Sequence, residues 1–260
     1  MKEPNSRHGL EARVTLAIRN RNYLTRKWEN KERRMIKCNA TAQWFWLTAM
    51  ILAIESQPSV GRSHSHNDVP NQAEDICPIL IGQSIPDAVL KTPDNAPLKL
   101  TSAIAEKPTL LIFYRGGWCP FCNQHLGGLQ SIESELVDMG FQIIAVSPDR
   151  PEKLNESVES QELSYRLLSD SDMTVAKSLG IAFKVDDETV NKYKTEYGID
   201  LEADSGQTHH LLPVPSAFLV GRDGAIKFAY VNPDYKVRIR PQVLLEVAKS
   251  ELRERPEKSQ

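Results

Sequence analysis

The stretch Thr109-Leu-Leu-Ile-Phe-Tyr-Arg-Gly-Gly-Trp-Cys-Pro-Phe-Cys122 decides both the fold and the chemistry expected of this chain. Its opening residues are apolar, aromatic or β-branched, which predicts a buried strand over 109–114. Two glycines then break the strand, and Pro120, a residue type favoured in a first helical turn, opens a predicted helix over 120–139. The sequence therefore places two cysteines one helical turn apart at a strand-to-helix junction.

Cys119 and Cys122 form a Cys-x-x-Cys pair at the predicted start of that helix. The unpaired N–H groups and partial positive charge of a helix N-terminus stabilise a thiolate. Such surroundings lower a cysteine pKa from about 8.5 to roughly 3.5–7.5. On this argument Cys119 is the more acidic and more exposed thiol and attacks first, after which Cys122 closes a disulfide. The pair predicts a thiol redox enzyme.

The residues around the pair are expected to shape the substrate site. Arg115 either favours the thiolate by its charge and binds a peroxide oxygen, or is a solvated arginine at a strand exit. Gly116 and Gly117 allow a tight turn and a close approach of the backbone to the substrate. Trp118 and Pro120 flank the first cysteine and complete the predicted site.

A structural zinc site is the alternative for the cysteine pair. Such a site needs four ligands, and the chain has no second Cys-x-x-Cys. His209 and His210 are adjacent, so on an extended segment their side chains point in opposite directions. The sequence therefore favours catalysis over metal binding, and predicts neither a bound metal nor a cofactor.

The composition is that of a soluble chain with one sizeable core, since 40% of its 260 residues are hydrophobic and 25% are charged. Met1–Arg34 holds ten basic and four acidic residues, whereas the chain after Ser56 has a net charge of −8. We expect no nucleic-acid binding by this acidic part. For the basic leader over 1–34, an RNA-binding arm is the alternative to an untranslated or unstructured segment.

Thr41–Ile54 is an apolar run preceded by basic residues and followed by polar ones. This order is typical of a secretory signal peptide, which we predict over 35–56. The run has 14 residues, fewer than the ~20 of a spanning helix, and a membrane anchor through 41–54 is the alternative. We expect translation to start at Met35 and the product to be exported, either periplasmic or anchored on the outer side of the membrane. If the segment is not a signal, the protein is cytoplasmic.

Four cysteines are too few to make a disulfide scaffold of a chain of this length. Cys38 leaves with the predicted signal peptide, and Cys77 is expected to be a peripheral free thiol. A Ser-, His- and Pro-rich linker is predicted over 57–75, a folded domain over 76–252 and a charged tail over 253–260.

Strand and helix signals alternate through the predicted domain. We expect strands in 89–100, 109–114, 141–146, 166–168, 217–220 and 225–230, and helices over 120–139, 151–161, 173–179 and 241–252. The last two strands flank Gly221-Arg-Asp-Gly224, which has the residues of a hairpin turn. This order predicts an α/β fold with a central mixed β-sheet and helices on both faces.

Further motifs carry a family resemblance. Beside Phe113–Leu126 around the cysteines, the chain contains Gly82-Gln-Ser-Ile-Pro-Asp87, Val146-Ser-Pro-Asp149, Leu168-Ser-Asp-Ser-Asp172, Gly198-Ile-Asp200, Pro213-Val-Pro-Ser216, Arg222-Asp-Gly224 and Val231-Asn-Pro-Asp-Tyr235. In this order they resemble the peroxiredoxin-like branch of the alkyl hydroperoxide reductase and thiol-specific antioxidant (AhpC/TSA) superfamily. The resemblance implies a thioredoxin-like fold, a peroxide substrate and an external dithiol reductant protein of the thioredoxin type, with no bound cofactor.

The resemblance assigns the two cysteines differently from the helix argument. In the family's Thr-x-x-Cys pattern the peroxide-reactive cysteine matches Cys122 and the threonine matches Cys119, while the usual proline is replaced by Arg115. The order of attack therefore stays open. Pro215 matches the proline that, in thioredoxin folds, lies against the active-site cysteines in a cis peptide. Trp118 matches the tryptophan that shields the disulfide in thioredoxin relatives.

Two functions are consistent with this sequence. The first is a peroxiredoxin-like thiol peroxidase that reduces hydrogen peroxide or alkyl hydroperoxides. The second is an exported thiol–disulfide oxidoreductase that acts on protein disulfides and ignores peroxide. The family motifs favour the first, and the tryptophan before the Cys-x-x-Cys favours the second. In either case we expect His125 on the helix surface rather than acting as a base, and Pro213 at the start of a strand.

Overall fold

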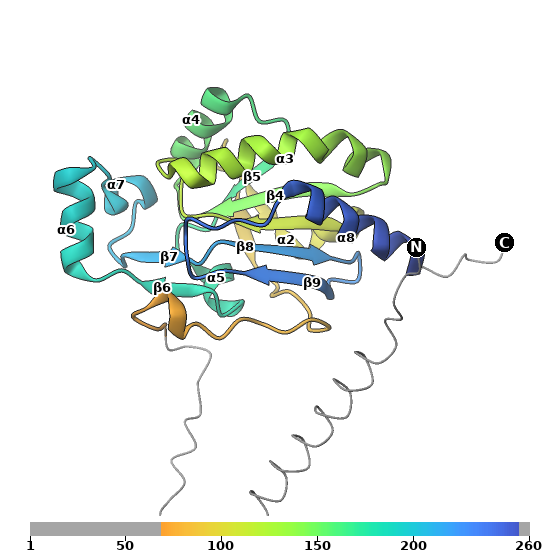
Figure 1. Cartoon of the computed structure of the whole chain (residues 1–260). Coiled ribbons are helices and arrows are strands. Elements are labelled where there is room, and N and C mark those ends of the chain that lie inside the picture. Colours follow the sequence, from red (N-terminus) through yellow and green to blue (C-terminus); the bar gives the residue numbers. More distant parts are fainter. Residues whose placement is uncertain (1–68, 255–260) are drawn as a thin grey trace, which may run out of the picture. The chain divides into compact units, whose positions relative to one another are not determined.

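A seven-stranded mixed sheet is the centre of residues 69–254, the part of the chain that the computed structural model describes (Figure 1). Its strands are β1 (Val89–Lys91), β2 (Pro97–Lys99), β3 (Thr109–Phe113), β4 (Gln142–Ser147), β5 (Arg166–Ser169), β8 (Ser216–Val220) and β9 (Ile226–Val231). They lie in the order β2-β1-β5-β4-β3-β8-β9. Strands β3 and β5 run parallel to β4, and the remaining neighbours are antiparallel.

Strand β3 is central because its residues tolerate burial on both faces. All five side chains are buried, with Leu111 paired to Ile144 of β4 on one side and to Phe218 of β8 on the other. Continuous apolar runs of this kind are typical of strands covered on both faces. The strand therefore forms where the sequence predicts it, and its carboxyl end leads directly to the cysteine pair.

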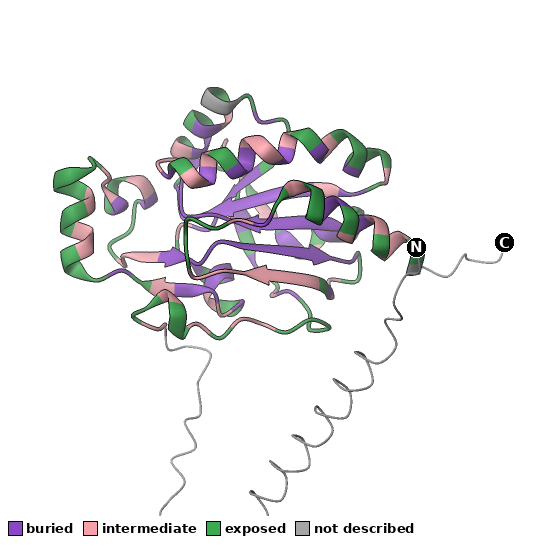
Figure 2. Ribbon diagram, viewed as in Figure 1, coloured by how far each residue is buried: buried purple, intermediate pink, exposed green. Residues whose placement is uncertain are grey.

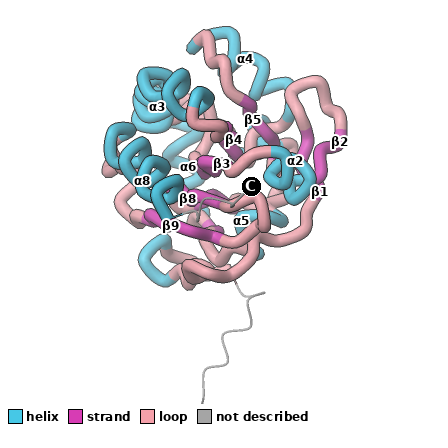
Figure 3. The backbone as a smooth tube through the Cα atoms, turned by 90° about the vertical axis from the view of Figure 1, so that its right-hand side faces the viewer, coloured by secondary structure: helices cyan, strands magenta, loops and turns pink. Residues whose placement is uncertain are grey.

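Helices cover both faces of the sheet. One face carries α3 (Pro120–Asp138), α4 (Pro151–Gln161) and α8 (Pro241–Glu254), and the other carries α2 (Leu100–Glu106) and α5 (Thr174–Ser178). Figure 3 shows α3 and α8 on one side of the strands and α2 on the other. The apolar stripe of α3 recurs every three or four residues and faces the sheet through Leu126, Leu129, Ile132 and Leu136.

A smaller antiparallel sheet and two further helices lie beside the main sheet. These elements are β6 (Ala182–Lys184), α6 (Asp187–Glu196), α7 (Leu201–Ser205) and β7 (Leu211–Pro213), and β6 pairs with β7. Asp186 caps α6 by accepting the Thr189 N–H at 2.8 Å. Helix α6 has no buried residue, and Figure 2 shows it as largely exposed. The pair α6–α7 is therefore an insertion attached to the edge of the core.

This architecture confirms the predicted fold class, α/β with a mixed central sheet and helices on both faces. The predicted helices over 120–139 and 151–161 correspond to α3 and α4, and the β8–β9 hairpin lies where its turn residues place it. The expected β segment ends early, because Leu100 begins helix α2. Leu100, Ala103 and Ile104 are buried together at helical spacing.

Part of the predicted linker over 57–75 lies within the described residues. There the chain forms a short 3-10 helix, η1 (Ala73–Asp75), and the Pro70 carbonyl accepts the Lys184 N–H at 2.8 Å. The predicted leader, the signal or anchor segment and the rest of the linker lie outside the described residues. Within 69–254, no helix combines the length and the apolar character that a membrane span requires.

Candidate active site

The two cysteines lie where β3 gives way to α3. Gly116 has a φ of 146°, a conformation that favours glycine, and its carbonyl accepts the Cys119 N–H at 3.1 Å. Cys119 is the N-cap of α3, and Pro120 occupies the first turn, as the sequence predicts. The Cys119 carbonyl then accepts the N–H groups of Cys122 and Asn123, both at 3.0 Å. The turn and the first helical hydrogen bonds thus fix both sulfurs at the helix N-terminus.

Both cysteines are free thiols, and both are buried. Cys119 is 1% exposed and Cys122 is 0% exposed. Cys119 is the more exposed thiol, as expected, but only by this small margin. Both residues belong to the main hydrophobic core, against which the half-buried side chains of Trp118 and Phe121 also pack. Only a small reactant reaches these sulfurs without displacing side chains.

Hydrogen bonding and burial give the two thiols different pKa values. A hydrogen bond from the Cys122 thiol lowers the pKa of Cys119 to about 6, with help from the charges of Arg115 and Arg238. Burial, followed by the hydrogen bond to Cys119, raises the pKa of Cys122 well above its ordinary value. The protonation state favoured at neutral pH is therefore a Cys119 thiolate that accepts a hydrogen bond from a neutral Cys122 thiol.

Arg238 is a site residue that the sequence analysis missed. It follows β9 in the loop leading to α8, and its Nη2 donates to the Cys122 sulfur at 3.3 Å. The same guanidinium donates to the Val237 carbonyl at 3.0 Å. The Val231–Tyr235 motif ends just before it, and only that proximity signals its role. Arg238, Cys122 and Cys119 form a chain of donors that ends on the Cys119 sulfur.

Arg115 is buried at 4% exposure, which rules out the solvated alternative. Its guanidinium carbon lies 5.0 Å from the centre of the Trp118 ring, 5.6 Å from that of Tyr193 and 4.3 Å from that of Tyr235. Nη2 also donates to the Tyr193 hydroxyl. The three aromatic rings hold Arg115 in place by cation–π contacts. Tyr193 comes from α6, so the insertion contributes to the site.

Gly117 is required by close packing. A Cβ at this position would lie 2.2 Å from the Ser157 hydroxyl of α4. Its N–H donates to the Asp149 carboxylate at 2.8 Å, and the Ser147 hydroxyl donates to the same carboxylate at 3.0 Å. Burial raises the pKa of Asp149 to about 7. The Asn123 side-chain amide donates to the Gly117 carbonyl at 2.8 Å, so the backbone N–H and the backbone carbonyl of Gly117 are both hydrogen-bonded.

Trp118 lies between the main core and the insertion. Its ring centre is 5.9 Å from that of Tyr193, and it packs against both the core around the cysteines and the small cluster of Val185, Leu201 and Leu212. Beyond the shielding expected of it, Trp118 therefore ties α6 and α7 to the cysteine loop.

Pro215 does not form the cis peptide expected from the resemblance, because no cis peptide bond occurs among residues 69–254. The chain passes extended from β7 to β8. There the Val214 N–H donates to the Ile181 carbonyl at 2.8 Å, and the Pro215 carbonyl accepts the Asn232 N–H at 3.2 Å. This extended path suits the residue before a trans proline. Pro213, expected to start a strand, instead ends β7.

The structure confirms the expected exposure of Cys77 but not that of His125. Cys77 is an exposed free thiol, as predicted. His125, expected on the surface, is buried at 8% exposure, because it lies on the stripe of α3 that faces the core. Burial, followed by the charge of Arg238, lowers the pKa of His125 to about 4. His125 is therefore neutral at physiological pH.

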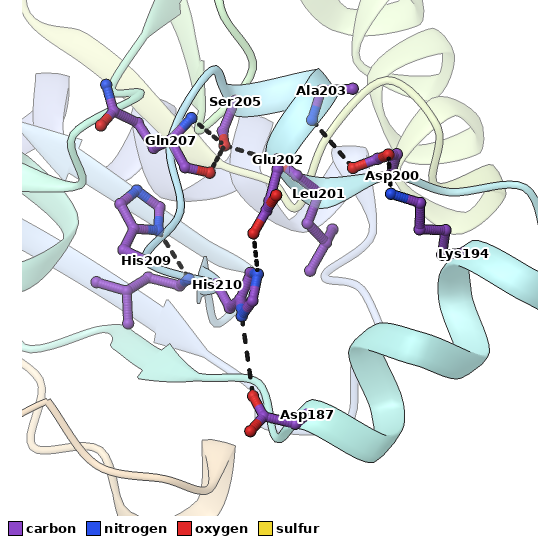
Figure 4. Close-up of polar contacts among 11 residues, drawn as sticks. Asp187, Lys194, Asp200, Leu201, Glu202, Ala203, Ser205, Gln207, His209 and His210 are labelled. Atoms are coloured by element: carbon purple, nitrogen blue, oxygen red, sulfur yellow. Dashed lines mark hydrogen bonds and ion pairs between the residues drawn. The ribbon is translucent and has the colours of Figure 1, made fainter.

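The adjacent histidines have separate structural roles. His210 contacts Glu202 of α7 at 2.8 Å and Asp187 of α6 at 4.0 Å (Figure 4). His209 contacts the Ser171 carbonyl at 2.8 Å through Nε2. The two side chains thus diverge, as predicted, and no cluster within 69–254 offers three or more metal-ligating side chains.

Comparisons with known proteins agree on one family. The AhpC/TSA family profile matches residues 81–229. The Bcp protein of Haemophilus influenzae is 34% identical over 104 residues, and the peroxiredoxin Bcp of Escherichia coli K12 is 31% identical over 104 residues. Each match covers 40% of this chain and 66% of the relative. The chain thus spans just under two thirds of the length of these curated relatives.

Solved structures share the fold at low sequence identity. A mutant of peroxiredoxin 6 from Arenicola marina superposes with a TM-score of 0.56 at 18% identity, covering 70% of this chain and 80% of that one. Reduced Prx3 from Vibrio vulnificus in complex with hydrogen peroxide gives a TM-score of 0.53 at 19% identity, and the match covers 65% of this chain and 99% of that one. The fold around the cysteine pair is the thioredoxin-like fold of peroxiredoxins.

Proposed function

The chain belongs to the AhpC/TSA family, and from this premise we propose that it is a peroxiredoxin-like thiol peroxidase. It reduces hydrogen peroxide or alkyl hydroperoxides through a dithiol/disulfide cycle of Cys119 and Cys122. One observation carries the proposal: two free, buried thiols lie one turn apart at a helix N-terminus, and Arg238 donates to one of them. This arrangement suits a nucleophile with a resolving partner at hand.

Cys119 is the attacking residue in this proposal. Its pKa of about 6 keeps it ionised at neutral pH, and the thiolate is the nucleophilic form. Cys122 keeps its proton and acts second. The matching position in the family's pattern favours the opposite order. In this chain, however, the helix N-cap and the hydrogen bond from Cys122 both stabilise charge on Cys119.

The proposed cycle conserves atoms and electrons. The Cys119 thiolate attacks the terminal oxygen of the hydroperoxide, so an S–O bond forms, the O–O bond breaks and the alkoxide leaves as an alcohol after taking a proton from solvent. Cys119 becomes a sulfenic acid. The Cys122 sulfur then bonds to the Cys119 sulfur, and its proton leaves with the hydroxyl group as water. An external dithiol protein reduces the disulfide by thiol exchange, and its own thiols are oxidised.

Burial of both sulfurs favours this function over protein thiol–disulfide exchange. Exchange requires a substrate sulfur in line with the attacking thiolate, so a protein substrate reaches residues that are 1% and 0% exposed only after the site opens. A hydroperoxide presents only two oxygens and needs a much smaller opening. Reduction of the resulting disulfide then needs a local opening around Phe121.

Stoichiometric oxidation tests the proposal. Reduced full-length protein carrying Cys38→Ser and Cys77→Ser, which leave only Cys119 and Cys122 as thiols, is mixed with one equivalent of hydrogen peroxide, and thiol loss is followed by stopped flow. We expect both remaining thiols to disappear, much faster than in free cysteine at the same pH. The same protein with Cys119→Ser added is the control. Thiol loss no faster than that of free cysteine would reject the peroxidase function.

A further inference from the structure

Arg115 is a buried cation without a carboxylate partner. No residue within 69–254 forms an ion pair with it. Its contacts are three aromatic rings and the Tyr193 hydroxyl, and its buried Nε has no hydrogen-bond partner. Burying a charge is costly unless it is paired. The site therefore has an unmet preference for an anion.

A pocket of about 260 Å³ lies against this arginine. A cavity of about 150 Å³ is enough to hold a benzene molecule, so the pocket accommodates a ligand built on one aromatic ring. Much of its wall is apolar or aromatic, from Phe183, Val185, Pro215 and Tyr235. Pockets with such walls and a few polar groups are typical of small organic ligands.

Polar groups in this pocket are arranged for a negative charge. The Tyr193 hydroxyl accepts from Arg115, so its own proton is left to donate. Lys184 adds a second positive charge to the lining, at its exposed side. The lining carboxylates, Glu74 and Asp186, are exposed, and Asp186 is occupied by the hydroxyl of Thr189 at 2.7 Å. The buried end of the pocket is therefore positive, and its negative groups are solvated.

We propose that this pocket binds the carboxylate of an aryl or short alkyl hydroperoxide. The carboxylate lies on the Arg115 guanidinium and the Tyr193 hydroxyl, and the apolar body packs on Tyr235 and Pro215. The inference rests on the proposed peroxidase function and names the substrate class of that site. Arg115 stands where the family's motif has proline, so the subsite is a feature of this chain rather than one implied by the resemblance.

Arg115 links the pocket to the reactive sulfurs. Its charge lowers the pKa of Cys119, and its backbone hydrogen-bonds to Cys122. Pro215, which lines the pocket, also lies beside Arg238, which contacts Cys122. In this proposal, a ligand held at Arg115 by its carboxylate extends past Pro215 toward the cysteine pair.

Paired substrates test the inference. Cumene hydroperoxide bearing a para-carboxylate is compared with its methyl ester, with hydrogen peroxide as the reference, in wild-type protein and in Arg115→Gln. We expect the wild type to react at least tenfold faster with the carboxylate than with the ester, and the ratio to fall close to one in Arg115→Gln. The control is Arg222→Gln, the same change in the β8–β9 turn, where the Arg222 Nε contacts the Ala105 carbonyl; it should keep the wild-type ratio.

Binding of benzoate, followed by isothermal titration calorimetry, gives a second readout that does not depend on turnover. It should bind the wild type, bind at least tenfold more weakly to Tyr193→Phe, and compete with the carboxylated substrate. Benzamide should not bind measurably. A carboxylate-to-ester ratio near one in the wild type, or a ratio retained in Arg115→Gln, overturns the inference. Failure to react with hydrogen peroxide rejects the peroxidase function instead. In that case the benzoate measurement alone shows whether the pocket binds a carboxylate.

Discussion

Arg238→Gln should raise the pKa of the reactive thiol. The residue donates to the Cys122 sulfur at 3.3 Å, and its charge lowers the pKa of both cysteines. The hydrogen bond within the cysteine pair remains the larger cause at Cys119. The hydrogen bond from Arg238 goes to Cys122, and only the charge of Arg238 acts on the Cys119 thiolate. Since 1.36 kcal/mol corresponds to about one pKa unit, we expect the pKa of Cys119 to rise by about one unit or less.

The assay is the pH dependence of iodoacetamide alkylation of Cys119 in a Cys77→Ser background, followed by mass spectrometry. Wild-type reactivity should rise with a midpoint near the pKa of about 6, and the Arg238→Gln midpoint should lie at higher pH. Arg240→Gln is the matched control, because Arg240 is exposed two residues along the same loop. A midpoint that moves equally in both variants, or in neither, would refute the role given to Arg238.

Three further predictions concern stability and location. Burial lowers the pKa of His125 to about 4, so its contribution to stability is complete above its unfolded pKa near 6.5 and is lost as pH falls toward 4. Because the raised pKa values of Asp149 and Asp170 act in the opposite direction, the test is the difference in urea unfolding free energy between the wild type and His125→Gln, which should change by roughly 3 kcal/mol across this window. Gly117→Ala places a Cβ 2.2 Å from the Ser157 hydroxyl and should cost about 1–3 kcal/mol, part of which Ser157→Ala should restore; equal stability of the single and double variants would contradict the packing argument. Fractionation of native host cells should find the domain outside the cytosol, whereas cytosolic protein still carrying residues 35–56 would defeat the export proposal.

The central elements could be predicted because single local signals fix them. The apolar run at Thr109–Phe113 admits only a buried strand, and Pro120 with the α3 stripe fixes the helix start and its buried face. The positions of both cysteines follow from that junction. The direction of their pKa difference also agrees with the sequence argument, although its main causes are the hydrogen bond from Cys122 to Cys119 and the burial of Cys122.

The rest of the site depends on contacts that local sequence does not encode. Arg238 and Tyr193 reach the site from a loop after β9 and from the insertion, far along the chain from the cysteines. The burial of Arg115 depends on Tyr235, whose ring packs against it at 4.3 Å. His125 shows the same limit. Its spacing along α3 places it on the buried stripe, whereas the polarity of its side chain predicts a surface position. Strands β6 and β7 are too short to give an alternating pattern.

Trapping of the sulfenic acid in single cysteine variants tests the central claim most directly. Cys122→Ser and Cys119→Ser, each with Cys38→Ser and Cys77→Ser so that one thiol remains, are treated with hydrogen peroxide and dimedone, and the labelled sulfur is identified by mass spectrometry. We expect Cys122→Ser to carry the label on Cys119, and Cys119→Ser to remain unlabelled. A label on Cys122 in the Cys119→Ser variant, with none on Cys119 in the other, would contradict the assignment of Cys119 as the attacking thiolate. Absence of label in both would contradict peroxide reduction by this pair.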